Sequence, residues 1–410
     1  MVSSNTNLRR VLAVAAVPAL VVAAVSLALP YSASGSTGCV GYNSFTKAIE
    51  VTCDATFSDI ANSGLPGPAL HGNATSGVWT LGSDVRVADG ARLSITRNDV
   101  SWLKITGAHS IFVNGRLQVD GIKITSWDTS THSTVPQEPR GSIERASIRL
   151  NGSEGGWIID SAIGYLGHAE PGKRGIDLYG VLPSSGFSIA NSRIHHMFHA
   201  VHTVQAHDIT IRGSEFHDNI GYSIDPHTGS YDINIIGNHV HHNNGIGIIC
   251  SLDCYDIVVE RNRVHDNGKV AIMFSRNTTN SIARFNTITG EPVGIAITES
   301  SHNRVYNNSI TAATSAITLN TQSDDPDRVS VNNTISANSM RDSYYGIKIT
   351  RSDDNTAINN EFARVGQEYF LSDDSALNIR DQDFSEVDLG GGSGGNAFNV
   401  TNTGEVVSEQ

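Results

Sequence analysis

A short phrase, Asn or Ser followed by any residue and then an apolar one, recurs from about residue 150 onward and constrains the fold more than any other feature. Three successive intervals are 24 residues long, others are 22, and two are near 30. Such a period, with β-branched residues and Asn or Gly turns, is typical of a solenoid built from strands. The phrase begins at nine positions: Ser161, Ser192, Ser214, Asn238, Asn262, Asn286, Asn308, Asn338 and Asn360.

A second strand of the form Gly-Ile-x-hydrophobic accompanies the first in several repeats, beginning at Gly175, Gly247, Gly294 and Gly346. Side chains alternate between the two faces of a strand, so the second and fourth positions of this phrase point into the coil and the others point to solvent. Stacked coils lie about 4.8 Å apart, so equivalent residues form columns along the outer face. The sequence therefore predicts an all-β chain, a right-handed parallel β-helix with an N-terminal cap.

Three segments are expected along the chain. Arg9 and Arg10 precede an apolar run at residues 11–29 and small residues at 32–34, which is the layout of a signal peptide over residues 1–33. The length of the run leaves an uncleaved membrane anchor as the alternative. The β-helix domain is expected over residues 39–385, of which 39–106 form the N-terminal cap and first coils. Residues 386–410 are expected to form a Gly-rich linker and C-terminal tail.

Charge and cysteine content indicate which binding partners and which cellular compartment to expect. The net charge of −13 argues against a nucleic-acid partner, although local basic residues can still bind a polyanion. Cys39 with Cys53, and Cys250 with Cys254, form two close pairs that suit local disulfides in an oxidising compartment, the second as a clip on a surface turn. We expect a secreted protein, extracellular or at the cell surface, with no membrane partner after signal cleavage and sufficient as a monomer.

Histidines recur in three turn phrases that begin at His217, His241 and His265, each ending in Asn two residues later. A metal site built from stacked histidines is conceivable, but the spacing restates the repeat, so no metal site is predicted. The asparagines are expected to form a ladder that satisfies turn backbones. The Gly-Gly-x-Gly-x-Asp type of calcium repeat is absent from the sequence, and neither a structural calcium ion nor another cofactor is predicted.

The segment Asp225-Pro226-His227 stands out from the equivalent strands. In the repeat frame Ile224 and Pro226 face inward, whereas Asp225 and His227 project from the outer face. A proline inside a strand gives up a ladder hydrogen bond, which is unfavourable unless the local geometry serves another purpose. An outward His beside an outward Asp suits a general base, with Asp225 orienting a neighbouring imidazole.

The outer face around this segment is expected to form a polar groove long enough for several sugars. His202 lies one coil before Asp225, and cations near the same side can neutralise uronate carboxylates. In such a groove a base can abstract the C5 proton of a uronate, while a cation stabilises the enolate-like intermediate and a second group returns a proton. The predicted substrate-binding residues are His202, Tyr222, Lys173, Arg174, Tyr179, Lys269, Glu299 and Lys348.

At these residues the chain resembles the single-domain β-helix mannuronan C5-epimerases, whose signature is Asp-Pro-His-Asp. Phrases at residues 163–167, 214–222, 276–277 and 299–300 also match in the same order, and the resemblance covers roughly residues 39–362. It implies that His227 is the base and Asp225 its signature partner. Arg276 matches a family arginine and completes the predicted catalytic set, although coil spacing places it about 9.6 Å from the level of His227.

The chain departs from the family at two positions. Thr228 replaces the final Asp of the signature, and Leu252 replaces an arginine that the family links to the substrate carboxylate. The predicted function is C5-epimerisation of an acidic polysaccharide resembling mannuronan. A lyase that shares the proton abstraction and a non-catalytic carbohydrate-binding β-helix remain alternatives. A glycoside hydrolase is disfavoured, because no convincing outward pair of carboxylates is present.

Overall fold

The computed structural model describes residues 38–180, 186–322, 328–373, 375–380, 387–389 and 397–401. The predicted signal peptide and the glycine-rich run at 390–395 lie outside these ranges. Within them, no helix combines the length and the apolar character that crossing a membrane requires.

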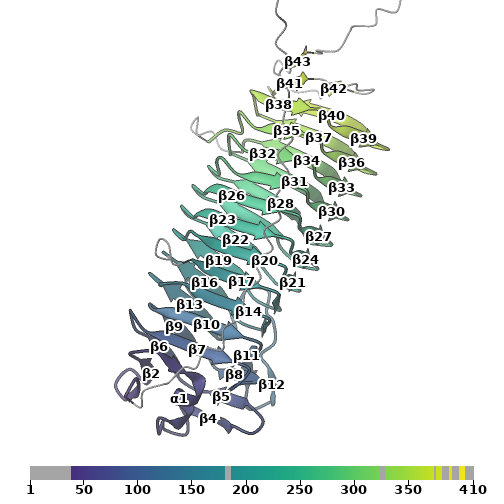
Figure 1. Cartoon of the computed structure of the whole chain (residues 1–410). Helices are drawn as coiled ribbons and strands as arrows, with labels where there is room; N and C mark the ends of the chain where they lie inside the picture. The colour runs from purple at the N-terminus through teal and green to yellow at the C-terminus, as the bar shows by residue number, and fades with distance from the viewer. Residues whose placement is uncertain are drawn as a thin grey trace, which may run out of the picture. The chain divides into compact units, whose positions relative to one another are not determined.

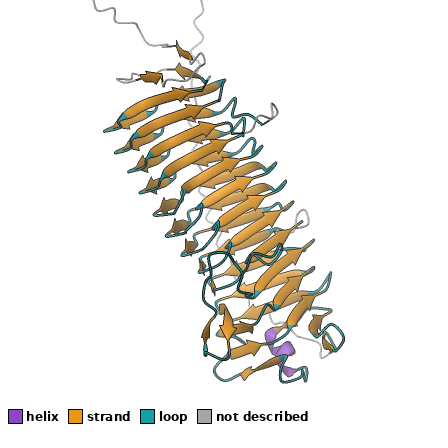
Figure 2. Ribbon diagram, turned by 180° about the vertical axis from the view of Figure 1, so that it is seen from behind, coloured by secondary structure: helices purple, strands orange, loops and turns teal. Residues whose placement is uncertain are grey.

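Three long sheets, numbered here 1 to 3, form the coils, and successive coils stack in parallel (Figures 1 and 2). Sheet 1 carries the segment Asp225-Pro226-His227, which the sequence predicts to be catalytic. Its strands, in order along the stack, are β1 (Val40–Asn43), β2 (Ala48–Val51), β6 (Asp84–Val87), β9 (Ser110–Val113), β13 (Ser147–Asn151), β16 (Ile176–Tyr179), β19 (Val201–Val204), β22 (Ile224–His227), β25 (Ile248–Ser251), β28 (Val270–Ser275), β31 (Val293–Thr298), β34 (Ser315–Asn320), β37 (Tyr345–Thr350), β40 (Gln367–Ser372) and β42 (Val387–Leu389).

Sheet 2 contributes the second strand of each coil. Its strands are β3 (Ala55–Thr56), β7 (Arg92–Thr96), β10 (Arg116–Asp120), β14 (Gly156–Ile159), β17 (Phe187–Ala190), β20 (Ile209–Arg212), β23 (Tyr231–Ile236), β26 (Tyr255–Glu260), β29 (Ile282–Arg284), β32 (Arg304–Tyr306), β35 (Thr334–Ser336), β38 (Asn355–Ile358), β41 (Ala376–Arg380) and β43 (Ala397–Thr401).

Sheet 3 contributes the third, mostly three-residue strand. Its strands are β4 (Leu70–Asn73), β5 (Val78–Leu81), β8 (Trp102–Thr106), β11 (Lys123–Asp128), β15 (Ala162–Gly164), β18 (Arg193–His195), β21 (Glu215–His217), β24 (His239–His241), β27 (Arg263–His265), β30 (Thr287–Thr289), β33 (Ser309–Thr311), β36 (Ser339–Arg341) and β39 (Glu361–Ala363). The short β12 (Ser133–Thr134) pairs with β11 in antiparallel orientation.

Columns of aliphatic side chains fill the interior, as the alternation predicts. Ile224, Ile248, Ile272, Ile295 and Ile317 lie in register on successive strands of sheet 1, and each is completely buried. Burying a side chain of this size contributes about 1.5–3 kcal/mol relative to leaving it exposed. The predicted parallel β-helix is confirmed, and its strand frame fixes which residues reach the outer face.

Asparagine ladders run through the turns that precede sheet 3, at the recurring Asn or Ser. The residue before each has a positive φ, for example 54° at Arg261 and 56° at Phe285, which bends the chain into the next strand. The Asn286 amide donates to Asn308 Oδ1 and to the Val259 carbonyl, both at 2.9 Å. The predicted ladder, in the turns that follow sheet 3, is also present: Asn219 donates to Asn243 at 2.9 Å and Asn243 to Asn267 at 2.7 Å. The asparagine prediction is therefore confirmed.

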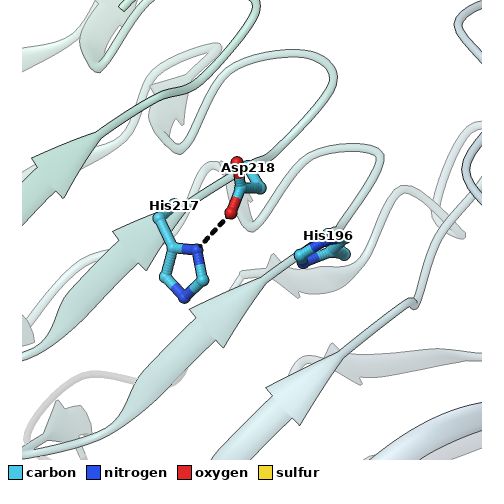
Figure 3. A group of neighbouring side chains, drawn as sticks. All are labelled: His196, His217 and Asp218. Carbon is cyan, nitrogen blue, oxygen red and sulfur yellow. Dashed lines mark hydrogen bonds and ion pairs between the residues drawn. The ribbon is translucent and has the colours of Figure 1, made fainter. Parts of the chain in front are cut away.

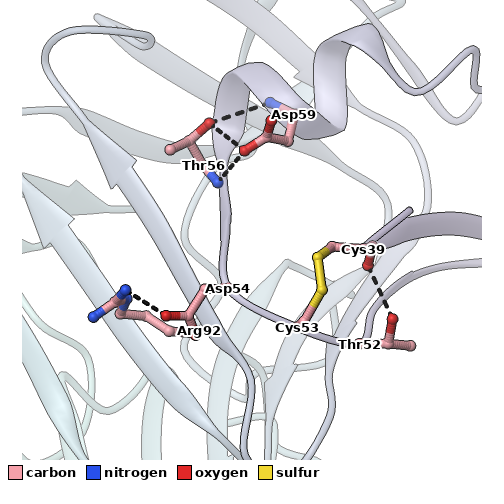
Figure 4. Close-up of a disulfide and its surroundings, with 7 residues drawn as sticks. All are labelled: Cys39, Thr52, Cys53, Asp54, Thr56, Asp59 and Arg92. Atoms are coloured by element: carbon pink, nitrogen blue, oxygen red, sulfur yellow. Dashed lines mark hydrogen bonds and ion pairs between the residues drawn. A yellow bond between two sulfur atoms is a disulfide. The ribbon is translucent and has the colours of Figure 1, made fainter. Parts of the chain in front are cut away.

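The first coils differ from the rest of the stack. β1 and β2 pair antiparallel, as do β4 and β5, and the helix α1 (Phe57–Asn62) contacts β3 and β7. Thr56 caps this helix: its hydroxyl accepts from the Asp59 backbone while the Asp59 carboxylate accepts from the Thr56 backbone (Figure 4). Cys39 and Cys53 form the predicted disulfide across the β1–β2 hairpin (Figure 4).

Two sequence predictions are wrong. Cys250 and Cys254 are free, buried thiols rather than a clip on a surface turn. Cys250 is an inward position of β25, in register with Phe274, and the Cys254 thiol donates to the Ser251 carbonyl at 3.2 Å. The stack also runs past the predicted boundary at residue 385, because β42 pairs with β40 and β43 pairs with β41.

Candidate functional site

The segment Asp225-Pro226-His227 forms β22, with Ile224 and Pro226 facing inward as predicted. Its pairing with β25 is registered only at the two ends, Ile224 with Ile248 and His227 with Ser251. Proline has no backbone N–H to donate, which accounts for the interruption. Asp225 faces outward from the coil but is completely buried, because neighbouring side chains cover it. The prediction of a solvent-exposed Asp225 is therefore wrong.

An Asp–His–Arg chain lies in the two coils before β22. His202 is in register with Asp225 and, on its other side, with Asp177. The His202 Nδ1 lies 3.1 Å from Asp177 Oδ1, and its Nε2 lies 3.1 Å from Arg174 Nη1. Because guanidinium nitrogens only donate, Nε2 is the acceptor and Nδ1 carries the proton that Asp177 accepts. His202 thus fixes the position of the Arg174 guanidinium.

Asp225 is a buried carboxylate with little direct compensation. Among the described residues neither of its oxygens accepts a hydrogen bond, and the nearest ion-pair partner is His199 Nδ1 at 3.5 Å. The His199 ring also packs against Tyr222, with centroids 5.2 Å apart. Buried polar groups without partners are rare in folded proteins and are common at functional sites. Asp225, His199 and Tyr222 therefore form one polar group beside β22.

His227 is half-buried, and its two ring nitrogens have different environments. Nδ1 lies 2.6 Å from the Thr228 hydroxyl, which leaves Nε2 as the nitrogen that can face a substrate. Burial lowers the pKa of His227, and the charges of His202, Arg276 and Arg174 lower it further, while Asp225 opposes the shift. The ring is therefore neutral at pH 7, the form that accepts a proton. Thr228, the departure from the signature, takes over the orienting contact.

Arg276 reaches back toward His227 and does not remain at its own coil level. Its Nε donates to Ser251 Oγ at 3.1 Å, and Ser251 is the register partner of His227. The Arg276 side chain therefore reaches the coil that carries Leu252, one coil beyond His227, although its backbone lies two coils beyond His227. Two guanidiniums, those of Arg174 and Arg276, thus approach His227 from opposite sides along the stack.

The other predicted substrate-binding residues lie at several positions along the stack. Tyr179 lies in the outward column of His227, two coils earlier, and its ring packs 6.1 Å from that of His202. Lys173 forms an ion pair with Glu170 at 3.1 Å. Glu299 lies in the turn one coil beyond Arg276, and Lys269 is exposed before β28.

Lys348 lies far from the predicted catalytic residues. It shares the column of Asp225 but five coils further along, about 24 Å away by coil spacing. Its ammonium group lies over the rings of Tyr345 and Phe370, with distances to the ring centroids of 5.1 and 5.5 Å. Lys348 therefore cannot contact a sugar that is bound at His227.

The sequence reasoning missed three residues of this face: Asp177, His199 and Arg149. Asp177 and Arg149 occupy the same column as His202 and Asp225, one and two coils before His202, so the repeat frame contained the signal. His199 precedes its strand, outside the regular alternation, and no periodicity points to it. Arg149 also lies over the Tyr179 ring at 4.5 Å, which extends the cationic surface toward the N-terminal coils.

A hollow of about 260 Å³ continues this face toward the N-terminus. It is lined by two arginines, two asparagines, a valine and a phenylalanine: Arg86, Arg149, Asn114, Asn151, Val87 and Phe112. A larger hollow of about 570 Å³ lies beside sheet 3, next to Lys123, Arg193 and Glu215, and is not part of this face. In the described ranges, the groups of His, Asp and Glu close enough to share an ion also lie on sheet 3.

The chemical capacity of the site follows from these contacts. A neutral imidazole with one free nitrogen can accept a proton, two fixed guanidiniums can stabilise an oxyanion or carboxylate, and a nearby phenol can donate a proton. The arrangement suits proton abstraction next to a carboxylate.

Two family models match parts of the chain. One, described as a right handed beta helix region, matches residues 172–310. The other, described as a periplasmic copper-binding protein (NosD), matches residues 311–402, a segment without histidine or cysteine. No curated protein sequence matches the chain at a significant level.

Solved structures with the same fold include the periplasmic alginate epimerase AlgG. It has a TM-score of 0.70 and 18% sequence identity, over 87% of this chain and 85% of AlgG. A mutant of AlgG matches with the same TM-score, identity and coverage. The A-module of the Azotobacter vinelandii mannuronan C-5 epimerase AlgE4 has a TM-score of 0.49 and 16% identity, over 72% of this chain and 87% of the module. The chain is a right-handed parallel β-helix with the fold of the alginate epimerase AlgG.

Proposed function

We propose that the chain is a polysaccharide-modifying enzyme that abstracts the C5 proton of a uronate and returns a proton to the opposite face, as a C5-epimerase of a mannuronan-like polymer. The observation that carries the proposal is the neutral His227 imidazole between the guanidiniums of Arg174 and Arg276. The similarity of the fold to an enzyme that acts on alginate supports a uronate polymer as substrate.

In this mechanism His227 Nε2 takes the C5 proton, and the electrons of the C5–H bond move into the neighbouring carboxylate. Thr228 holds Nδ1, so the free nitrogen faces the sugar. Arg174 and Arg276 stabilise the negative charge that develops on the carboxylate oxygens, an effect that is strong where water is excluded. The buried Asp225 carboxylate then stabilises the imidazolium ion that forms.

The second proton must come from the other face of the sugar. Tyr222 is the phenol that packs against His199, which in turn faces Asp225 at 3.5 Å. We assign Tyr222 as the group that returns the proton to C5, so that a Tyr222→Phe variant is expected to abstract the proton but to complete epimerisation slowly. The proton count is balanced, because one proton leaves C5 to His227 and another reaches C5 from Tyr222.

Binding along the polymer would involve the cationic surface toward the N-terminal coils. Arg149 and Arg86 line the hollow that continues the face, and arginine binds carboxylates with two parallel hydrogen bonds. Arg174 lies between this hollow and His227. We propose that uronates on one side of the reacting sugar bind there, outside the cytoplasm, where the Cys39–Cys53 disulfide is stable and where the similar AlgG is located.

The test is proton NMR of polymannuronate, and separately of a glucuronan, incubated with the chain in deuterated water. Conversion to the C5 epimer with deuterium at C5 is expected for one of the polymers, and a His227→Asn variant should abolish turnover but retain polymer binding. His302→Asn is the matched control, because His302 lies in the turn between β31 of sheet 1 and β32 of sheet 2, where its Nδ1 contacts Ser301.

Three outcomes would change the assignment. Unsaturated chain ends instead of epimers would identify a lyase, which shares the proton abstraction but expels the 4-O-linked sugar. Turnover that survives in His227→Asn would refute His227 as the base. Binding of either polymer without any deuterium exchange would favour a non-catalytic carbohydrate-binding β-helix.

A further inference from the structure

Histidines stack on sheet 3, on a different sheet from the site described above. His195, His217, His241 and His265 occupy one outward column on β18, β21, β24 and β27. Their rings are nearly parallel, at interplanar angles of 9°, 7° and 6°, with centroids 5.1–5.3 Å apart. We call these four residues the histidine ladder. Imidazole is the most common metal ligand among protein side chains, so the ladder places several such ligands at coil spacing.

At the upper half of the ladder, ligand atoms from three consecutive coils converge. His239 lies beside His241 on β24, with ring centroids 4.2 Å apart. The His239 Nε2 lies 2.7 Å from His265 Nε2, and His241 Nε2 lies 3.1 Å from Glu215 Oε1. Ligand atoms of Glu215, His239 and His241 all lie within 4.8 Å of one another. Glu215, His239 and His241 offer two ring nitrogens and one carboxylate oxygen, and the His265 nitrogen beside His239 offers a third ring nitrogen.

The second ring nitrogens of His265 and His241 also have partners, and the partner of His265 directs its Nε2. His265 Nδ1 lies 2.7 Å from Asp266 Oδ2, and His241 Nδ1 lies 2.7 Å from His242 Nδ1. A carboxylate that accepts from Nδ1–H leaves the lone pair on Nε2 and fixes the ring, which is the usual arrangement around histidines that bind metals. The His265 Nε2 is therefore oriented toward His239, where an ion would be.

We propose that Glu215, His239, His241 and His265 form a binding site for a divalent transition-metal ion such as Zn²⁺, Ni²⁺ or Cu²⁺. Imidazole with one carboxylate suits these ions, whereas Ca²⁺ and Mg²⁺ prefer all-oxygen sites. The ion would replace the proton that His239 and His265 share. Two ring nitrogens on a tetrahedral ion lie about 3.3 Å apart for Zn–N bonds of about 2.0–2.1 Å, so the two rings need to separate by less than about 1 Å.

Charge around the site is compatible with a cation. Arg193 contacts Glu215 Oε2 at 3.2 Å, which leaves Oε1 facing His241. Asp266 adds a second carboxylate next to His265.

The lower half of the ladder is less suited to an ion, although His196, His217 and Asp218 also lie together (Figure 3). His217 Nδ1 is bound to Asp218 Oδ2 at 2.6 Å, as the dashed line in Figure 3 shows. Its Nε2 accepts from Arg193 Nε at 2.8 Å, so no lone pair remains on that ring. The proposal is therefore limited to β21, β24 and β27, where the ion would tie three coils together.

The test is calorimetric titration of the full chain, without a polyhistidine tag and after treatment with a chelator, with ZnCl₂. One equivalent of Zn²⁺ is expected to bind, and a His239→Gln/His265→Gln variant should lose at least about 100-fold in affinity. Asp266→Asn, which removes only the orienting carboxylate, should lose about 10- to 100-fold. His217→Gln and His302→Gln are the matched controls and should bind as the wild-type chain does.

A second measurement keeps the proposal testable if the double variant folds poorly. Electron paramagnetic resonance of one equivalent of Cu²⁺ on the wild-type chain should show splitting from imidazole nitrogens, reduced in His239→Gln alone. Zinc affinity in the folded double variant within threefold of the wild type would overturn the proposal. So would loss of binding in His227→Asn or His217→Gln, because the ion would then lie elsewhere.

Discussion

An asparagine ladder ends at Glu291, whose ionised carboxylate form is unfavourable in this buried position. The ladder runs from Asn219 through Asn243 and Asn267, and the Asn267 amide donates to Glu291 Oε1 at 2.6 Å. Glu291 is 2% exposed, and its Oε2 has no hydrogen-bond partner among the described residues. Burial raises the pKa of Glu291 from 4.5 to about 7, against the lowering effect of the Asn267 hydrogen bonds. The carboxylate form therefore destabilises the fold.

The size and the sign of the effect follow from proton linkage. Because the pKa in the folded chain is higher than in the unfolded chain, stability is greatest below pH 4.5 and falls as the pH rises toward 7. A pKa of about 7 in place of 4.5 corresponds to at most about 3 kcal/mol. Relaxation of the protein around the buried charge reduces this cost, so we expect about 2 kcal/mol.

The perturbation is Glu291→Gln, which keeps the acceptor for Asn267 and removes the charge. Its free energy of unfolding, from urea titrations followed by fluorescence, should exceed that of the wild type by about 2 kcal/mol at pH 8 and by less than about 1 kcal/mol at pH 5. Glu361→Gln is the control, because Glu361 is exposed on β39. An equal difference at both pH values would refute the electrostatic reasoning and point to packing instead.

Four other outcomes are expected. Asn286→Ala should cost about 3 kcal/mol in urea unfolding, because buried donors and acceptors on both sides of the ladder lose partners. The thiols of Cys250 and Cys254 should resist maleimide in the folded chain and react once it is unfolded, since both are buried. Leu252→Arg should change the rate of epimerisation by less than about threefold, because Arg276 already reaches this level; a tenfold gain would contradict this. The acidic limb of kcat/KM should fall below pH 6.5, because the pKa of the His227 base is lowered from 6.5; an inflection above pH 7 would contradict it.

The coil frame was predictable because it depends on local alternation alone. Each Asn or Ser phrase marks the turn before sheet 3, and each inward Ile follows from the two-residue period of a strand. The same reasoning placed Asp225 and His227 on the outer face and His202 one coil before, in register with Asp225. The stack beyond residue 385 was missed because β42 and β43 flank a glycine-rich run that resembles a linker.

Two properties were not predictable from the coil frame: which neighbouring side chains cover a residue, and how far a long side chain extends along the stack. Alternation states on which side of a strand Asp225 lies, but whether water reaches it depends on His199, which precedes its strand and follows no period. Likewise, Cys250 and Cys254 resemble a surface clip by spacing, although one is an inward strand position. A long, flexible side chain can also extend to the neighbouring coil. The column of a residue therefore gives the position of its side-chain end along the stack only to within one coil, about 4.8 Å.

That uncertainty decides how the two departures from the epimerase signature are interpreted. By columns alone, Leu252 removes a guanidinium and Thr228 removes a carboxylate, so His227 would lack both partners. In the structure, Arg276 spans the missing level and donates to Ser251, while the Thr228 hydroxyl contacts Nδ1. A neutral hydroxyl supplies no charge to raise the pKa of His227, so the proposed base is weaker but remains deprotonated at lower pH. The combination therefore favours activity that persists into mildly acidic conditions.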